Sequence, residues 1–203
     1  MNKIMCLILT GVFLAGCSVQ PAIAAEQKAV FAGGCFWGVE AVFEHVKGVV
    51  DVKSGYAGGN KETANYDEVS TGETKHAESV EIRFDPAKVT YEQILKIFFE
   101  VAHDPTELNR QGPDVGPQYR SVVFYLNEEQ KRTAKGFIES VNASKKFAGT
   151  VVTEVVPFDH FYPAEGYHQD FMKKNPDHPY IVYHDVPKVV ALKKQFPGLY
   201  FEK

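Results

Sequence analysis

The stretch VFAGGCFWGVEAVFEHV, residues 30–46, decides how the fold of this chain begins. Its first residues are apolar and predict a buried strand, which Gly33 and Gly34 end. After the glycines, apolar residues recur at three- and four-residue steps, which predicts a helix that ends at Gly48. Cys35 therefore stands in a tight turn, at the N-terminus of a helix.

This position predicts a reactive thiol. The unpaired amide groups and the dipole at a helix N-terminus favour a thiolate, so we expect the pKa of Cys35 to be lowered. The alternative is a buried, inert cysteine, which is common for this residue type. The glycine turn before Cys35 favours the reactive interpretation.

The rest of the chain alternates between strand and helix patterns, and some strands follow one another directly. Further strands are predicted at residues 49–57, 76–85, 119–127 and 150–158. Helices are predicted at 90–103 with Thr90 as N-cap, at 127–147, and near 187–195. This order predicts an α+β fold: a ferredoxin-like α/β sandwich of split βαβ units, with helices packed on a mixed sheet and a long irregular C-terminal tail.

Composition bounds the class of protein. The chain has 203 residues, 44% of them hydrophobic and 24% charged, which is typical of one globular domain with a sizeable core. A net charge of -4 without a basic run argues against nucleic-acid binding. One cysteine outside the N-terminal segment, with scattered histidines, argues against a zinc site.

The N-terminal segment, residues 1–25, has the pattern of a secretion signal, so the folded domain is expected at 26–203. Its apolar stretch is too short to span a bilayer comfortably. LAGC, which ends at Cys17, resembles the bacterial lipoprotein box and predicts a lipid anchor there. AIA, which ends at Ala24, is the rival cleavage site and would release a soluble protein. The predicted location is the periplasmic side of the cell envelope if the protein is lipid-anchored, and otherwise the periplasm or the outside of the cell as a soluble protein. Both interpretations leave Cys35 as the only free thiol.

The strand at 76–85 puts a carboxyl group on an apolar face. Glu78 shares its face with Val80, Ile82 and Phe84. The opposite face is expected to meet water and carries Ala77, Ser79, Glu81 and Arg83. Burial raises the pKa of a carboxyl group and keeps it protonated, as a general acid requires. The alternative is that Glu78 lies at the strand end and reaches solvent.

Aromatic side chains flank the thiol. Trp37 lies about 100° round the helix from Phe36, so it can line a pocket beside Cys35, although core packing would also explain both rings. The other polar candidates lie in loops or at element boundaries, where turns and caps are common: Tyr66, Asp114, Tyr119 and His168. A Cys–His hydrolase is conceivable, but no histidine is close to Cys35 in the sequence.

Four motifs together resemble one known family. They are GCFWG (34–38), HAESV (76–80), DVGPQYRS (114–121) and AEGYHQDF (164–171). In this order they resemble the signatures of peptide methionine sulfoxide reductase A, and the similarity extends from Ala29 to about Pro179. The resemblance implies thiol-dependent reduction of methionine S-sulfoxide, free or in proteins, through a cysteine sulfenic acid.

The resemblance also implies a role for each candidate. Cys35 would attack the sulfoxide sulfur, and Glu78 would protonate the oxygen. Hydrogen bonds from Tyr66 and Tyr119 would assist this step. An apolar pocket for the S-methyl group would be formed by Phe36 and Trp37, with Asp114 and His168 in the same site.

The sequence departs from the family pattern in three places. Pro117 stands where the family commonly has Thr or Ser, and Phe171 stands where Tyr is usual. Residues 149–203 contain no cysteine, so the recycling cysteines of many members are missing. We therefore expect no bound cofactor and an external thiol reductant, either a thioredoxin-like protein or a small thiol.

Two other functions fit parts of the pattern. A single-cysteine thiol peroxidase would form the same sulfenic acid. A non-enzymatic envelope lipoprotein could bind Met-rich partners through its aromatic surface. The leading hypothesis is the reductase, repairing oxidised envelope proteins.

Overall fold

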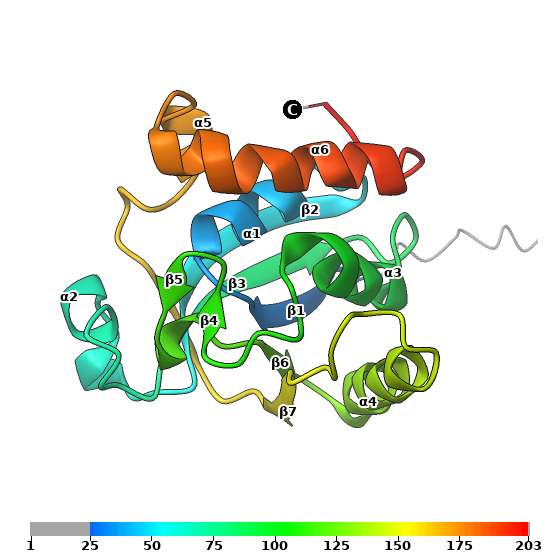
Figure 1. Ribbon diagram of the computed structural model, residues 1–203, viewed down its shortest axis with the longest axis horizontal. Coiled ribbons are helices and arrows are strands. Elements are labelled where there is room, and N and C mark those ends of the chain that lie inside the picture. The colour runs from blue at the N-terminus through cyan, green and yellow to red at the C-terminus, as the bar shows by residue number, and fades with distance from the viewer. Residues whose placement is uncertain (1–24, 203) are drawn as a thin grey trace, which may run out of the picture.

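A six-stranded mixed sheet organises the computed structural model, which describes residues 25–202 (Figure 1). Its strand order is β7-β6-β1-β3-β2-β8. The strands are β1 (Gln27–Ala32), β2 (Val49–Ala57), β3 (Ala77–Phe84), β6 (Val122–Tyr125), β7 (Glu154–Pro157) and β8 (Phe161–Pro163). Neighbours are antiparallel except β6 and β7, which are parallel. The α+β class and the mixed sheet are thus as predicted.

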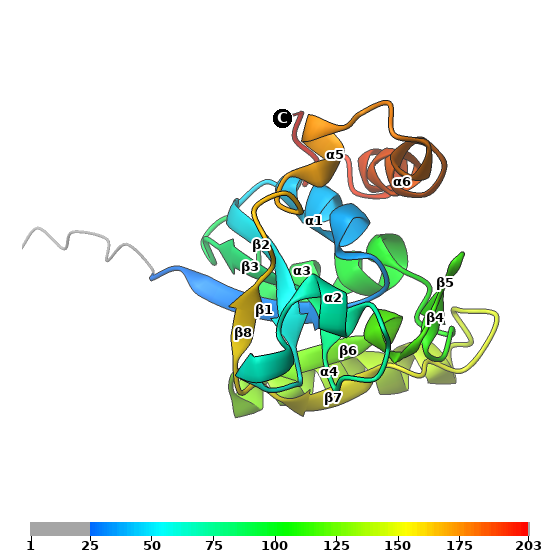
Figure 2. The ribbon, with the colours of Figure 1, turned by 90° about the vertical axis from the view of Figure 1, so that its left-hand side faces the viewer.

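The main core lies between the sheet and helices that include α1 (Phe36–Glu44), α3 (Tyr91–Ile97) and α4 (Glu128–Ala143). Figures 1 and 2 show α6 (Val186–Gln195) lying over α1, away from the sheet. The shorter helices are α2 (Tyr66–Val69) and α5 (Phe171–Lys174). Two short 3₁₀ helices are η1 (Lys61–Thr63) and η3 (Pro117–Tyr119), and two short π-helices are η2 (Phe98–Ala102) and η4 (Ile181–Asp185). Within residues 25–202, none of the helices has the length and apolar character needed to cross a bilayer.

Residues 29–32 of β1 are buried on both faces, which explains their continuous apolar run. On the helix side, the ring of Phe31 stacks on Phe98 with centroids 4.6 Å apart. The other face belongs to a second, smaller cluster that consists of Val30, Ala32, Ala57, Ala77, Val122 and Phe124. The strand that leads into Cys35 is therefore fixed by packing from both sides.

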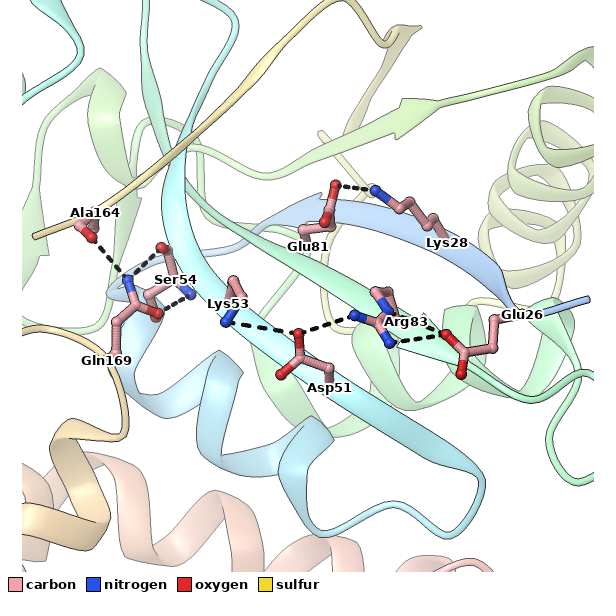
Figure 3. A network of polar contacts seen from close by, with 9 residues as sticks. All are labelled: Glu26, Lys28, Asp51, Lys53, Ser54, Glu81, Arg83, Ala164 and Gln169. Atoms are coloured by element: carbon pink, nitrogen blue, oxygen red, sulfur yellow. Dashed lines mark hydrogen bonds and ion pairs between the residues drawn. The ribbon is translucent and has the colours of Figure 1, made fainter. Parts of the chain in front are cut away.

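Strand β3 follows the predicted alternation on its apolar face, but its other face meets water at one end only. Ala77 and Ser79 are buried, because the second cluster covers that end of the sheet. At the other end, Glu81 pairs with Lys28, and Arg83 pairs with Glu26 and Asp51 (Figure 3).

Several expected boundaries differ from the structure. Thr90 caps α3 as predicted, with a capping box to Gln93. The α-helix ends at Ile97, and the chain continues as the π-helix η2 from Phe98. The loop at 57–75 contains η1 and α2, and the loop at 104–118 contains the hairpin of β4 (Arg110–Gln111) and β5 (Asp114–Val115). Tyr119 belongs to η3 and not to a strand, so β6 begins at Val122.

The C-terminal tail contains a strand that periodicity did not predict. Strand β8 pairs with β2, and Gln169 ties the following segment to the same edge. Its side-chain amide bonds to Ser54 N at 3.0 Å, Ser54 O at 2.8 Å and Ala164 O at 3.0 Å (Figure 3). These bonds fix residues 164–169 beside the sheet. The proposed signal segment, with Cys17 and Ala24, lies outside the described residues.

Candidate active site

Two glycines make the turn before α1 possible. Gly34 has φ +85°, and a Cβ atom there would lie 2.5 Å from the side chain of Gln111. A Cβ atom at Gly33 would lie 2.9 Å from the ring of His103. Both close approaches require glycine, and Cys35 follows them as the N-cap residue of α1.

Cys35 is buried, with 8% of its surface exposed. Burial raises its pKa well above the ordinary value, and Glu78 and Asp185 in their ionised forms raise it further. The Trp37 backbone N–H and the Lys188 ammonium act in the opposite direction but are weaker. The predicted lowering of the pKa of Cys35 is therefore wrong for the free protein, because desolvation outweighs the helix terminus. The resting thiol is protonated.

Glu78 is buried, as the strand alternation predicted, with 3% of its surface exposed. Its Oε2 accepts a 3.0 Å hydrogen bond from the backbone N–H of Phe36, next to Cys35. Burial raises the pKa of Glu78 to about 8, although the Phe36 amide lowers it. The carboxyl group is mostly protonated at neutral pH, so it can act as an acid beside the thiol.

The same two groups, Glu78 and Cys35, affect both candidate phenols. Burial raises the pKa of Tyr66 and of Tyr119, and Glu78 and Cys35 in their ionised forms would raise both further. Each phenol therefore stays a neutral O–H donor. Glu165 anchors the start of α2, accepting from the Tyr66 backbone N–H at 2.9 Å.

An aromatic stack fixes the indole of Trp37. Its ring lies parallel to that of Phe171, with centroids 3.6 Å apart and planes at 6°. The indole N–H donates to Nδ1 of His168 at 3.1 Å. The centroid of the buried Phe36 ring lies 5.0 Å from that of the His168 ring. Phe171 provides the stack with no hydroxyl group, so the departure from Tyr leaves the aromatic contact intact.

His168 joins these aromatic side chains. It is 2% exposed, and burial lowers its pKa, so it is neutral. Because Nδ1 accepts from Trp37, the proton of the neutral ring belongs on Nε2. That nitrogen has no hydrogen-bond partner within the described chain and lies 4.0 Å from the carboxylate of Glu165.

Asp114 is linked to the site through Tyr180. The Tyr180 hydroxyl donates to Asp114 Oδ2, and its ring meets Trp37 edge-on at 5.9 Å. The charge of Asp114 also raises the pKa of Glu78.

The structure gathers every site residue predicted within its described part around the turn before α1. Sequence reasoning missed four neighbours: Glu165, Tyr180, Asp185 and Lys188. Glu165 stands inside a quoted motif, which was a usable signal. Nothing local marks the other three, because only tertiary contacts bring the C-terminal tail to α1. Among residues 25–202, no group of three or more His, Cys, Asp or Glu side chains is placed to hold a metal ion.

Comparison with known proteins gives the same family throughout. Residues 27–198 match the family model of peptide methionine sulfoxide reductase. MsrA 2 of Mesorhizobium japonicum is 54% identical over 91% of this chain and 94% of that protein. MsrA 2 of Synechocystis sp. is 56% identical over 84% of this chain and 79% of that protein.

Solved structures agree with the sequence comparison. Reduced Mxr1 of Saccharomyces cerevisiae matches with a TM-score of 0.71 and 33% identity, covering 78% of this chain and 90% of Mxr1. Methionine sulfoxide reductase A of Corynebacterium diphtheriae matches with a TM-score of 0.66 and 33% identity, covering 78% of this chain and 77% of its own. A complex of Mxr1 with Trx2 shares the fold at a TM-score of 0.51 and 22% identity, covering 76% of this chain and 91% of that one. The chain thus belongs to the peptide methionine sulfoxide reductase family, of the MsrA type, and is a peptide-methionine (S)-S-oxide reductase.

Proposed function

We propose that Cys35 is the nucleophile of this reductase and that Glu78 is its general acid. The observation that carries the assignment is the 3.0 Å hydrogen bond from the Phe36 amide to the Glu78 carboxyl group, which joins the acid to the residue after the thiol. The sulfur of Cys35 gives two electrons to the sulfoxide. The S–O bond of the substrate breaks, an S–O bond forms on Cys35, and methionine leaves a cysteine sulfenic acid behind.

Proton transfer follows from the two raised pKa values. Attack requires the thiolate of Cys35, and the departing oxygen requires a proton. A protonated Glu78 supplies that proton and puts no negative charge beside the sulfur. As the sulfur attacks, the thiol passes its proton to the other oxygen of the Glu78 carboxyl group while that group protonates the departing oxygen, so the site returns to its initial protonation state. The neutral phenols of Tyr66 and Tyr119 donate hydrogen bonds to the same oxygen.

The aromatic side chains select the substrate. Phe36 and Trp37 form the surface for the S-methyl group, and the stack on Phe171 together with the bond to His168 keeps the indole in one orientation. Only the S epimer of the sulfoxide can place its methyl group on this surface while its oxygen faces Glu78.

Reduction of the sulfenic acid needs an external thiol. Residues 149–203 contain no cysteine, and Cys35 is the only free cysteine of residues 25–202. An external thiol attacks the sulfenic sulfur and releases water, and a second thiol then frees Cys35 as a disulfide forms. A thioredoxin-like protein is the proposed donor, supported by the complex of the yeast relative Mxr1 with Trx2.

The proposed location is the periplasmic side of the envelope, where the enzyme would repair oxidised proteins. The support is the signal-like segment 1–25, with lipidation at Cys17 preferred over cleavage after Ala24. Palmitate labelling of the wild type, lost in Cys17→Ala, is expected. An unlabelled wild type would favour the soluble form.

Replacement of the nucleophile tests the proposed function. Cys35→Ser is expected to abolish reduction of methionine S-sulfoxide by a dithiol, with the fold retained by circular dichroism. Competition between hydrogen peroxide and the sulfoxide for the wild-type enzyme separates the reductase from a thiol peroxidase. Wild-type turnover by the Ser variant would refute the role of Cys35.

A further inference from the structure

A buried ion pair packs against the first turn of α1, on residues that no motif identified. Asp185 is fully buried, and its Oδ1 lies 3.2 Å from Nζ of Lys188, whose side chain is 19% exposed. A Cβ atom on Gly38 would lie 2.1 Å from Asp185 Oδ1 and 2.7 Å from Lys188 Nζ. Gly38, the last residue of the motif GCFWG, therefore leaves the space in which this pair packs against the helix.

The pair shares a helical turn with the thiol. Cys35 is the N-cap residue, and Gly38 is the third residue of the helix. An N-cap side chain faces the backbone of the second and third helical residues. The carboxylate and the ammonium therefore border the same turn as the sulfur. Consistent with this, Lys188 lowers the pKa of Cys35, and Asp185 raises it.

Stability alone does not account for the pair. Burying two charges costs free energy that their attraction often fails to recover, so such pairs are weak evidence for stabilisation. In addition, Oδ2 of Asp185 is buried without a hydrogen-bond partner in the described chain. A site that keeps such a pair against a nucleophilic sulfur points to a role in its chemistry.

We propose that Lys188, held in place by Asp185, is a positioning residue that stabilises the thiolate of Cys35 during attack on the sulfoxide. This inference rests on the proposed role of Cys35 as the nucleophile. Lys188 supplies a positive charge beside the first turn of α1, and Asp185 anchors that charge while partly opposing it. The two residues therefore have opposite effects on the sulfur.

Other titratable groups also face Cys35, and most of them oppose the thiolate. They are Glu78 from β3, Tyr66 from α2, Tyr119 from η3, and Tyr180 and Asp185 from the C-terminal tail, while Asp114 from β5 acts on Glu78. Lys188 is the cation among the groups that act most strongly on the thiol. Removal of the Lys188 charge should therefore change the pKa of Cys35, because no second positive charge among these groups compensates for it.

The test measures alkylation of Cys35 by iodoacetamide against pH in the full chain, with the modified peptide identified by mass spectrometry. Lys188→Met is expected to raise the pKa of the thiol by about one unit, which is about tenfold slower alkylation at a fixed pH below it. Asp185→Asn keeps an oxygen for Lys188 and is expected to lower the pKa. Lys188→Arg should retain a profile close to that of the wild type.

A matched control is Lys193→Met on the same helix, since Lys193 is 60% exposed and pairs with Glu202. Its profile should match the wild type. A Lys188→Met profile identical to the wild type, or shifts of the same sign in Lys188→Met and Asp185→Asn, would overturn the proposal. If Lys188→Met does not fold, the Asp185→Asn variant decides: a lowered pKa of Cys35 supports the proposal, and a pKa that is not lowered overturns it. Alkylation needs no sulfoxide, so this result is independent of the Cys35→Ser activity test.

Discussion

The backbone N–H of Phe36 and the carboxyl group of Glu78 are joined by a 3.0 Å hydrogen bond inside the protein. The bond links the first residue of α1 to a residue of strand β3 that lies 42 positions away in the chain. It gives one buried acid a fixed place beside the thiol of Cys35. The chemistry proposed for this reductase depends on that arrangement.

Replacing the acid should slow oxygen transfer without disturbing the thiol. Glu78→Gln keeps an oxygen acceptor for the Phe36 amide but cannot give up a proton. We expect single-turnover reduction of methionine S-sulfoxide to fall roughly 10²-fold or more. Cys35 should still react with iodoacetamide; loss of that reaction would show that Glu78 is structural.

The stack on Trp37 should contribute to substrate binding. Phe171→Ala removes a ring contact worth about 1 kcal/mol, so kcat/KM for the sulfoxide is expected to fall about fivefold. Phe171→Tyr keeps the ring and should retain wild-type values. Trp37 is the single tryptophan, so a red shift of its emission in the Ala variant reports the exposure directly. Unchanged kinetics with shifted emission would exclude the stack from substrate binding.

The turn before Cys35 should not tolerate a side chain. Gly34→Ala adds a Cβ atom at φ +85° and 2.5 Å from Gln111, so we expect a loss of about 2 kcal/mol or more in unfolding free energy. Gly136→Ala is the control, since it lies inside α4 with nothing within 4 Å of the added atom. That variant should gain about 0.5–1 kcal/mol. Equal stability of both variants in urea unfolding would contradict the account of the turn.

A buried carboxyl group on α1 should make stability depend on pH. Burial raises the pKa of Glu40 from 4.5 to about 8, so the folded state holds a proton that the unfolded state releases. The protonated Glu40 carboxyl group contributes to the free energy of unfolding; this contribution is fully present below pH 4.5 and is lost as pH rises through about 8. Glu40→Gln should therefore gain stability relative to the wild type as pH increases from 5 to about 8, measured by urea unfolding. A difference that does not vary with pH would contradict the raised pKa.

The parts of the site that depend on local sequence pattern, the strand β3 and the turn before Cys35, were predictable. The two-residue period of β3 predicts the direction of Glu78, because strand backbone fixes it whatever the neighbours are. The double glycine predicts the turn before Cys35, because few other residues fit it.

The rest depends on contacts between distant segments. The charge state of Cys35 was predicted from its helix alone, and the wrong result came from leaving out burial by other elements. Tyr180, Asp185 and Lys188 reach the site only because η4 and α6 lie over α1, and sequence spacing does not encode that packing.

The central claim is that Cys35 itself receives the oxygen of the substrate. Mass spectrometry of the full chain, after one equivalent of methionine S-sulfoxide without reductant, tests it directly. The account predicts one methionine released and one oxygen atom added to the peptide that contains Cys35. Release of methionine with Cys35 unmodified would contradict it.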